Sequence, residues 1–241
     1  MQRGEKVHEG KAKVVFRTAD PELFIQYFKD DATAFDGKKR GTVTGKGAIN
    51  ARISAALFQL LEGAGIRTHF VDQLDDTQML VKAVEIVPVE VVVRNIIAGS
   101  LSRRTGLDEG TKLAFPIVEL YYKRDDLGDP LFNRDHIRVL GLASDEVIAQ
   151  MVASSRRVNE LLTEFFAGVG ITLVDYKLEY GLAGDELLLA DEISPDTCRF
   201  WDAKTGEKLD KDRFRRDMGQ VEEAYQEVLG RIRASGSAGG R

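Results

Sequence analysis

The chain has 241 residues, 43% of them apolar, and a formal net charge of −5. This length allows one large domain or two lobes with a real core. The acidic balance argues against a general nucleic-acid binder. A single cysteine, Cys198, excludes an internal disulfide framework and fits a reducing, intracellular setting. No apolar run approaches the roughly 20 residues that span a bilayer, so we expect a cytoplasmic protein with neither nucleic-acid nor membrane partners.

The N-terminal part, residues 1–84, reads mainly as strands around one helix. The expected strands cover residues 6–9, 12–17, 23–29, 68–72 and 79–84. Apolar residues recur at helical spacing between Gly45 and Gly65, which predicts a helix there. Pro88 interrupts the pattern shortly afterwards and indicates a connection between two lobes.

The second part, residues 85–234, mixes strands and helices without a clean βαβ repeat. It opens with a β-rich run at 89–97 that contains two charges. Ser144 is placed to cap a long helix that ends near Ala167. Strands are expected at 171–181 and 187–190, and a helical region at 212–232 that breaks near Gly219. We therefore expect an α+β fold with mostly antiparallel sheets, followed by a flexible Gly/Ser-rich tail at 235–241.

The strongest local signal is the charged pattern in the predicted strand 171–181. Side chains alternate between the two faces of a strand, so Asp175, Lys177 and Glu179 share one face. Such charges are costly to bury without partners. With Asp191 at the end of the next predicted strand, they suggest a site for metal ions and phosphate. A buried network of ion pairs is the alternative.

The proposed metal pair imposes a condition on strand register. Asp191 lies on the face of Glu179 only if facing residue numbers add to an even value, as with 177 and 191. A three-residue loop at 183–185 meets this condition, whereas a two-residue turn at 184–185 does not. We therefore predict the odd-length loop or a bulge.

Other motifs are ambiguous on local sequence alone. Residues 10–13 form either a solvated basic turn or a phosphate contact made by a glycine and two lysines. Arg94 in its apolar strand either pairs with a carboxylate or, beside the small turn at 98–100, binds an anion. The charge run 33–40 is a solvated loop or a substrate loop, and 121–130 reads as a surface loop.

Taken in order, these motifs resemble those of the SAICAR synthetase (phosphoribosylaminoimidazole-succinocarboxamide synthase) family, from about residue 9 to residue 219. The matching segments are Gly10-Lys-Ala-Lys13, Pro88-Val-Glu-Val-Val-Val-Arg94 with Ala98-Gly-Ser100, Leu173-Val-Asp-Tyr-Lys-Leu-Glu-Tyr-Gly181, Asp191-Glu-Ile-Ser-Pro-Asp196 with Arg199-Phe-Trp-Asp202, and Asp210-Lys-Asp-Arg-Phe-Arg215. Tyr180 stands where the family usually has phenylalanine, and Phe200 where leucine is common.

The resemblance implies an ATP-dependent ligase that joins L-aspartate to the carboxylate of CAIR, a carboxylated aminoimidazole ribonucleotide, to give SAICAR in purine biosynthesis. It implies two lobes of kinase-like or ATP-grasp-like architecture with ATP between them, Mg²⁺ as cofactor, and a homodimer. Lys177 would act on the transferred phosphoryl group, with Asp175 in support, and Glu179 and Asp191 would hold Mg²⁺. The implied ATP contacts are Gly10, Lys11, Ala12, Lys13, Val15, Val81, Lys82, Val84, Lys123, Glu179 and Asp191. The implied CAIR contacts are Arg94, Ser100, Arg199, Asp36, Asp129 and Asp196, with Arg215 as a further anion contact or a surface residue.

Two rival hypotheses remain at this point. A small-molecule kinase would share the lobes but transfer phosphate to a hydroxyl without needing aspartate. A nucleotide-binding regulatory module would not turn over at all. Lys177 together with Glu179 and Asp191 weighs against the second, since a pure binder does not need a transfer lysine.

Overall fold

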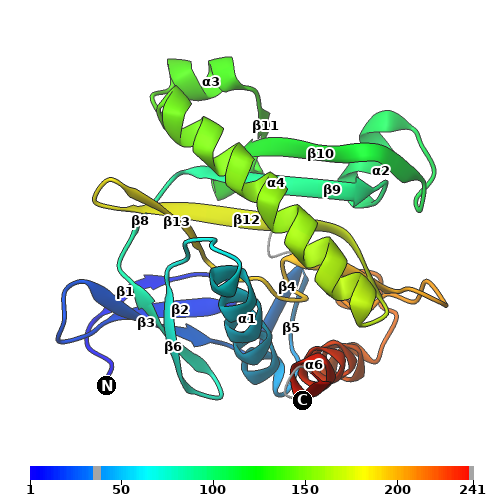
Figure 1. Ribbon diagram of the computed structural model, residues 1–241, viewed down its shortest axis with the longest axis horizontal. Coiled ribbons are helices and arrows are strands. Elements are labelled where there is room, and N and C mark those ends of the chain that lie inside the picture. The colour runs from blue at the N-terminus through cyan, green and yellow to red at the C-terminus, as the bar shows by residue number, and fades with distance from the viewer. Residues whose placement is uncertain (35–38, 239–241) are drawn as a thin grey trace.

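A computed structural model describes residues 1–34 and 39–238, and its strands form two main antiparallel sheets with helices packed against them (Figure 1). The smaller sheet has the order β1-β2-β3-β7-β6 and is N-terminal. Its strands are β1 (Lys6–Glu9), β2 (Lys13–Arg17), β3 (Leu23–Phe28), β6 (Phe70–Asp75) and β7 (Gln78–Lys82). Helix α1 (Lys46–Gly63) packs on β3, β6 and β7, and a separate hairpin joins β4 (Asp31–Ala34) to β5 (Lys39–Thr42).

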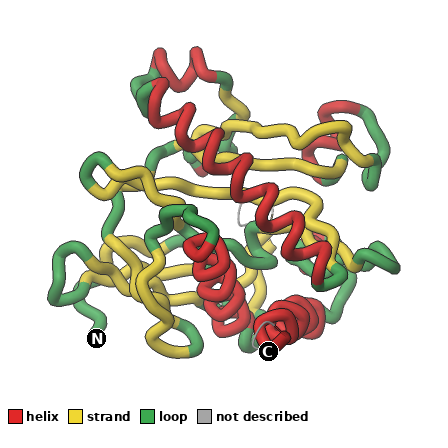
Figure 2. The backbone as a smooth tube through the Cα atoms, viewed as in Figure 1, coloured by secondary structure: helices red, strands yellow, loops and turns green. Residues whose placement is uncertain are grey.

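The larger sheet has the order β11-β10-β9-β12-β13, with β8 and β14 also paired to β12. Its strands are β8 (Glu85–Ile86), β9 (Val89–Ile96), β10 (Lys112–Tyr122), β11 (Leu131–Phe132), β12 (Ile171–Ala183), β13 (Glu186–Ala190) and β14 (Cys198–Asp202). The remaining helices are α2 (Gly99–Thr105), the 3-10 turn η1 (Asp125–Leu127), α3 (Arg134–Val139), α4 (Asp145–Gly168), α5 (Asp212–Arg215) and α6 (Val221–Ala238). The long helix α4 crosses this sheet, and α6 packs against α1 (Figure 2). The predicted α+β, mostly antiparallel architecture is confirmed.

Helix α4 forms as its sequence predicts. The Ser144 hydroxyl accepts the backbone N–H of Val147 at 3.2 Å, and two acidic residues occupy the first turn. Its buried face contains Ile148, Met151, Ser155, Val158, Asn159, Leu162 and Phe166. This face packs on β12, the strand that carries Lys177.

The chain passes between the two sheets beside the C-terminal end of β12. A Cβ atom on Gly181 would lie 2.5 Å from Cγ2 of Val84, so only glycine allows this close approach. β8 then pairs with β12 through Gly181 and Leu182. One hydrophobic core runs through both halves, from Phe58 of α1 to Val91 of β9. The lobes are therefore packed as one body rather than as separate units.

Some elements differ from the sequence prediction. In the charge run 33–40, residues 33–34 end β4 and residues 39–40 begin β5, and the expected surface loop 121–130 begins inside β10. Pro116 lies within β10, where the pairing with β9 is irregular between Lys112 and Ile117. Helix α6 continues to Ala238, beyond the expected start of the tail. In the described part of the chain, no helix is long and apolar enough to cross a membrane.

Candidate functional site

A lysine and three carboxylates meet at the middle of the larger sheet. Lys177 on β12 places its Nζ 2.5 Å from Glu179 Oε1, 3.1 Å from Glu90 Oε1 and 4.0 Å from Asp191 Oδ2. The predicted trio of Lys177, Glu179 and Asp191 is therefore brought together. Glu90, one of the two charges noted in the strand at 89–97, was not predicted as a member.

The smaller sheet contributes a second lysine to this centre. Lys13 on β2 bonds to Asp191 and lies 2.7 Å from Glu192 Oε1. Lys123 follows β10 and lies 3.0 Å from Glu179. We call these residues, with Lys177, Glu90 and Glu179, the lysine–carboxylate centre. Its ion pairs connect the two lobes, because Lys13 belongs to the smaller sheet and Asp191 follows the larger one.

The predicted register of the β12–β13 hairpin was wrong. Glu179 faces Ala190 and Ala183 faces Glu186, so facing numbers add to an odd value and the turn has two residues. Asp191 lies just beyond the ladder and has a φ of 64°, in the left-handed region. This backbone conformation, rather than an odd loop, brings Asp191 near Lys177. Aspartate tolerates it better than most residues.

Lys177 and Asp191 are each held in their ionised form by opposite charges in this centre. Burial alone would lower the pKa of Lys177, but Glu179, Glu90 and Asp191 outweigh it and raise that pKa well above its usual value. Burial alone would likewise raise the pKa of Asp191, but Lys13 and Lys177 pull it well below its usual range. Lys177 therefore stays cationic near neutral pH and can serve as an electrostatic partner for phosphate.

The centre fits Mg²⁺ bound together with a substrate. In residues 1–34 and 39–238 no group of three His, Cys, Asp or Glu side chains forms a ready cage for a metal ion. Mg²⁺ usually binds through one or two carboxylates, with phosphates and water completing the octahedron. Glu179 and Asp191, both beside the ammonium of Lys177, provide that limited donor set.

An arginine cluster adjoins this centre along the same strand. Arg94 on β9 lies 2.8 Å from Asp175 Oδ2, 2.6 Å from Glu119 Oε2 and 3.0 Å from the Ser100 hydroxyl. Arg199 on β14 also lies 2.8 Å from Asp175. The predicted anion contacts Arg94, Ser100 and Arg199 therefore meet, and Asp175 stands between the two arginines.

A glycine makes room for one of these arginines. Gly99 opens α2 with a φ of 53°, and a Cβ there would lie 2.5 Å from Arg199 Nη2. Any side chain would push the guanidinium away. Glycine is thus required at position 99 both by the left-handed backbone and by the close packing of Arg199.

Comparison with known proteins identifies the family. The sequence matches the family described as SAICAR synthetase over residues 6–232. The chain belongs to the SAICAR synthetase family. It is 57% identical over 235 residues to the phosphoribosylaminoimidazole-succinocarboxamide synthase of Magnetococcus marinus, covering 96% of this chain and 97% of that protein.

Solved structures agree with this assignment. The Ehrlichia chaffeensis phosphoribosylaminoimidazole-succinocarboxamide synthase superimposes with a TM-score of 0.93 at 46% identity, covering 95% of this chain and 99% of that one. A SAICAR synthetase solved in complex with ADP gives a TM-score of 0.91 at 51% identity, with 95% and 97% covered.

In this SAICAR synthetase family member, the expected ATP contacts lie around the smaller sheet. Gly10 closes the β1–β2 turn by donating its N–H to the Lys13 carbonyl at 2.9 Å, and Lys11 at this turn pairs with exposed Asp125 at 2.9 Å. The backbone carbonyl of Ala12 accepts the N–H of Lys29 at 2.8 Å. Val15 is half-buried in β2.

The segment between the lobes contains the expected adenine contacts. Val81 is buried in β7, whereas Lys82 is exposed at the end of that strand. Val84 packs against Gly181. The backbone after β7 thus runs past β12 close to the lysine–carboxylate centre.

The three weaker substrate assignments have different outcomes. Asp36 lies outside the described residues. Asp129 has a φ of 45° and its carboxylate accepts the backbone N–H of Arg124 at 2.9 Å, which fixes a turn. Asp196 is buried, where it pairs with Lys46 at 2.7 Å and accepts the Tyr225 hydroxyl at 2.7 Å. Its two oxygens therefore serve the fold.

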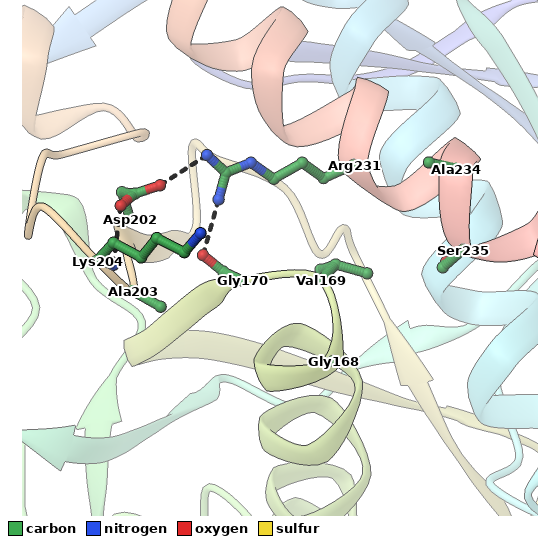
Figure 3. A pocket seen from close by; sticks show the side chains of 9 residues that line it. All are labelled: Gly168, Val169, Gly170, Asp202, Ala203, Lys204, Arg231, Ala234 and Ser235. Atoms are coloured by element: carbon green, nitrogen blue, oxygen red, sulfur yellow. Dashed lines mark hydrogen bonds and ion pairs between the residues drawn. The ribbon is translucent and has the colours of Figure 1, made fainter.

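A separate hollow of about 550 Å³ lies at the end of α4 and beside α6 (Figure 3). It is lined by Gly168, Val169, Gly170, Asp202, Ala203, Lys204, Arg231, Ala234 and Ser235. Arg231 donates to the Gly170 carbonyl at 2.7 Å and to Asp202 at 2.6 Å (Figure 3). None of the predicted site residues lines this hollow, so it is distinct from the lysine–carboxylate centre.

Proposed function

We propose that this chain joins L-aspartate to the carboxylate of CAIR with ATP, releasing SAICAR, ADP and phosphate in purine biosynthesis. The observation that carries the proposal is the pair of adjoining charge centres on β12, with Lys177 in one and Asp175 in the other. One centre suits a nucleotide polyphosphate and the other suits the phosphate of a ribonucleotide. The family assignment supports the same reaction.

The chemistry explains why the two centres adjoin. A carboxylate is a poor acyl donor because its leaving group would be oxide. In the first step a CAIR carboxylate oxygen bonds to the γ-phosphorus of ATP, and ADP leaves. In the second step the aspartate amine attacks the acyl carbon, the C–N bond forms and phosphate leaves. Lys177 stabilises the negative charge on the transferred phosphoryl group.

The ATP site combines residues from both lobes. Lys11, Lys13 and Lys123 contact the phosphates, and Gly10 and Ala12 let the β1–β2 turn approach them. The segment after β7 holds the adenine through backbone groups, with Val15 and the residues Val81, Lys82 and Val84 around it. The related SAICAR synthetase that was solved in complex with ADP supports a nucleotide site.

Glu179 and Asp191 would hold Mg²⁺ beside the phosphates. When bound, Mg²⁺ would neutralise the charge that the transfer concentrates on phosphate oxygens. Arg94, Ser100 and Arg199 hold the ribonucleotide phosphate, since guanidinium groups pair with phosphate through two hydrogen bonds. Asp175 keeps both arginines oriented from between them.

The deciding experiment measures ADP release from the purified chain with ATP, Mg²⁺ and CAIR, with and without L-aspartate. We expect sustained release only with aspartate, and SAICAR as the product. Lys177→Ala should abolish it, whereas Lys204→Ala, which removes an exposed lysine, should not. A stable phosphorylated product without aspartate would indicate a small-molecule kinase instead, and nucleotide binding without turnover would indicate a regulatory module.

We also propose that two copies form a homodimer. Val139 and Leu140, at the end of α3, are 84% and 53% exposed, and a second copy could cover such apolar surface. Light scattering on the purified protein should then give twice the 26.8 kDa of one chain. A single-chain mass across the working concentration range would contradict the dimer.

A further inference from the structure

Lys211 is a largely buried cation without a hydrogen-bonded acid. Its side chain is 13% exposed, and its Nζ lies 4.0 Å from Asp196 Oδ2, beyond hydrogen-bond distance. That oxygen is already bonded to Lys46 at 2.7 Å, and the other oxygen of Asp196 accepts the Tyr225 hydroxyl. Within residues 1–34 and 39–238, no group accepts a hydrogen bond from the Lys211 ammonium. Buried charges are normally paired.

Lys211 shares Asp196 with Lys46, and the cation of Arg215 lies nearby. Asp196 carries one negative charge and faces both Lys46 and Lys211. Arg215 lies one helical turn further, and its partner Asp212 is shared with Arg199. Burial lowers the pKa of Lys211, and the charges of Arg215 and Lys46 act in the same direction against the attraction of Asp196 and Glu192. An anion placed here would offset these positive charges.

This cation lies beside both charge centres. The Lys211 N–H donates to the Pro195 carbonyl at 3.0 Å, and the Lys177 N–H donates to the Thr197 carbonyl at 2.9 Å, so one short turn supports both lysines. Glu192, which bonds to Lys13, is among the carboxylates that act on Lys211. The turn 194–197 thus connects Lys211 to the strand of Lys177, and Asp212, the residue after Lys211, pairs with Arg199 of the arginine cluster.

We infer that Lys211, with Arg215 beside it, is the subsite that binds a carboxylate of the acyl-accepting amino acid, L-aspartate. The inference rests on the proposed function. The lysines around Glu179 and Asp191 serve the polyphosphate, and Arg94 and Arg199 serve the ribonucleotide. The remaining anionic substrate is the dicarboxylic amino acid, whose amine must reach the acyl carbon formed between these two centres.

The test replaces Lys211 by methionine and measures the kinetic constants for each substrate separately. We expect Lys211→Met to raise KM for L-aspartate about ten- to hundredfold, the range for losing one charge-assisted hydrogen bond. KM for ATP and for CAIR should change less than about threefold. The inhibition constant of succinate, which has both carboxylates but no amine, should rise in parallel with KM for aspartate.

Lys208→Met is the matched control. Lys208 is also 13% exposed and lies close in sequence, but it is paired with Glu109 at 2.6 Å. We expect no selective change in KM for aspartate from this variant. Lys211→Gln removes the charge but can still donate to Asp196, so it replaces the methionine variant if the latter does not fold.

The outcomes separate the inference from the function. An unchanged KM for aspartate in active Lys211→Gln or Lys211→Met enzyme would overturn the subsite while leaving the synthetase function in place. A rise confined to KM for CAIR would assign Lys211 to the ribonucleotide and would also overturn it. If wild-type enzyme forms no aspartate-dependent product, the proposed function itself fails, and the inference fails with it.

Discussion

The buried pair of Lys46 and Asp196 provides a direct test of whether Asp196 anchors the fold. The side chains are 1% and 3% exposed, and their charged atoms lie 2.7 Å apart. Lys46 begins α1 in the N-terminal lobe, whereas Asp196 follows β13 in the other. The pair thus links the two halves next to the site.

Lys46→Met should destabilise the fold because it leaves the Asp196 carboxylate buried without its closest cation. Removing one partner of a buried pair costs about 3–5 kcal/mol. Asp196 would keep the Tyr225 hydroxyl at 2.7 Å and the more distant Lys211 at 4.0 Å. We therefore expect a loss at the lower end of that range, about 3 kcal/mol.

Urea denaturation followed by circular dichroism gives the free energy of unfolding for this comparison. Lys6→Met is the control, because Lys6 and Glu9 form an exposed pair with 56% and 44% of their side chains accessible, and such pairs contribute about 0–1 kcal/mol. Adding Asp196→Asn to Lys46→Met should recover part of the loss. A loss below about 1 kcal/mol for Lys46→Met would refute the anchoring role.

Two further predictions concern the charge centres. Asp191→Asn should lower turnover at least about a hundredfold, the size of effect seen when one group that stabilises transition-state charge is removed. It should also weaken Mn²⁺ binding, measured by electron paramagnetic resonance, whereas Asp185→Asn at the exposed hairpin turn should change neither quantity. A wild-type-like Mn²⁺ affinity of Asp191→Asn would place the metal elsewhere. Burial and the charge of Asp212 raise the pKa of Asp210 to about 7, so stability that is present below the unfolded value is lost as pH rises toward 7, by up to about 1.4 kcal/mol per pH unit. Asp210→Asn should remove this dependence, and its stability relative to wild type should grow between pH 4 and 7 in urea denaturation; a constant difference would contradict the assignment.

The sequence predicted elements well where one local signal dominates. The Ser144 cap and the helical spacing after it correctly gave α4, and the strands flanking Gly10 were found within one residue. β10 was missed because Pro116 interrupts its pattern, and a proline is compatible with an irregularly paired strand only once the neighbouring strand is known. Whether such a segment forms a strand depends on pairing with a strand distant in the sequence.

The candidate site was predictable where charge interrupts an apolar strand. Arg94 and Lys177 were identified for this reason, and both lie in charge centres. Asp191 was expected near Lys177 because of an even strand register, and that argument was wrong. The alternation of side chains between the two faces of a strand stops at Ala190, where the pairing of β13 ends. A left-handed backbone at one aspartate changes the direction of its side chain, and no sequence pattern distinguishes that conformation from an extended one.

Lys46 and Lys211 show most clearly what only the folded chain reveals. Both are lysines that face the same oxygen of Asp196, one at 2.7 Å and one at 4.0 Å. Lys46 is 1% exposed and bonded to Asp196, so its charge stabilises the fold. Lys211 is 13% exposed and has no bonded acid in residues 1–34 and 39–238, which is why we propose a ligand for it. The distance between partners, rather than residue type, therefore distinguishes the anchoring lysine from the lysine that we propose to bind a ligand.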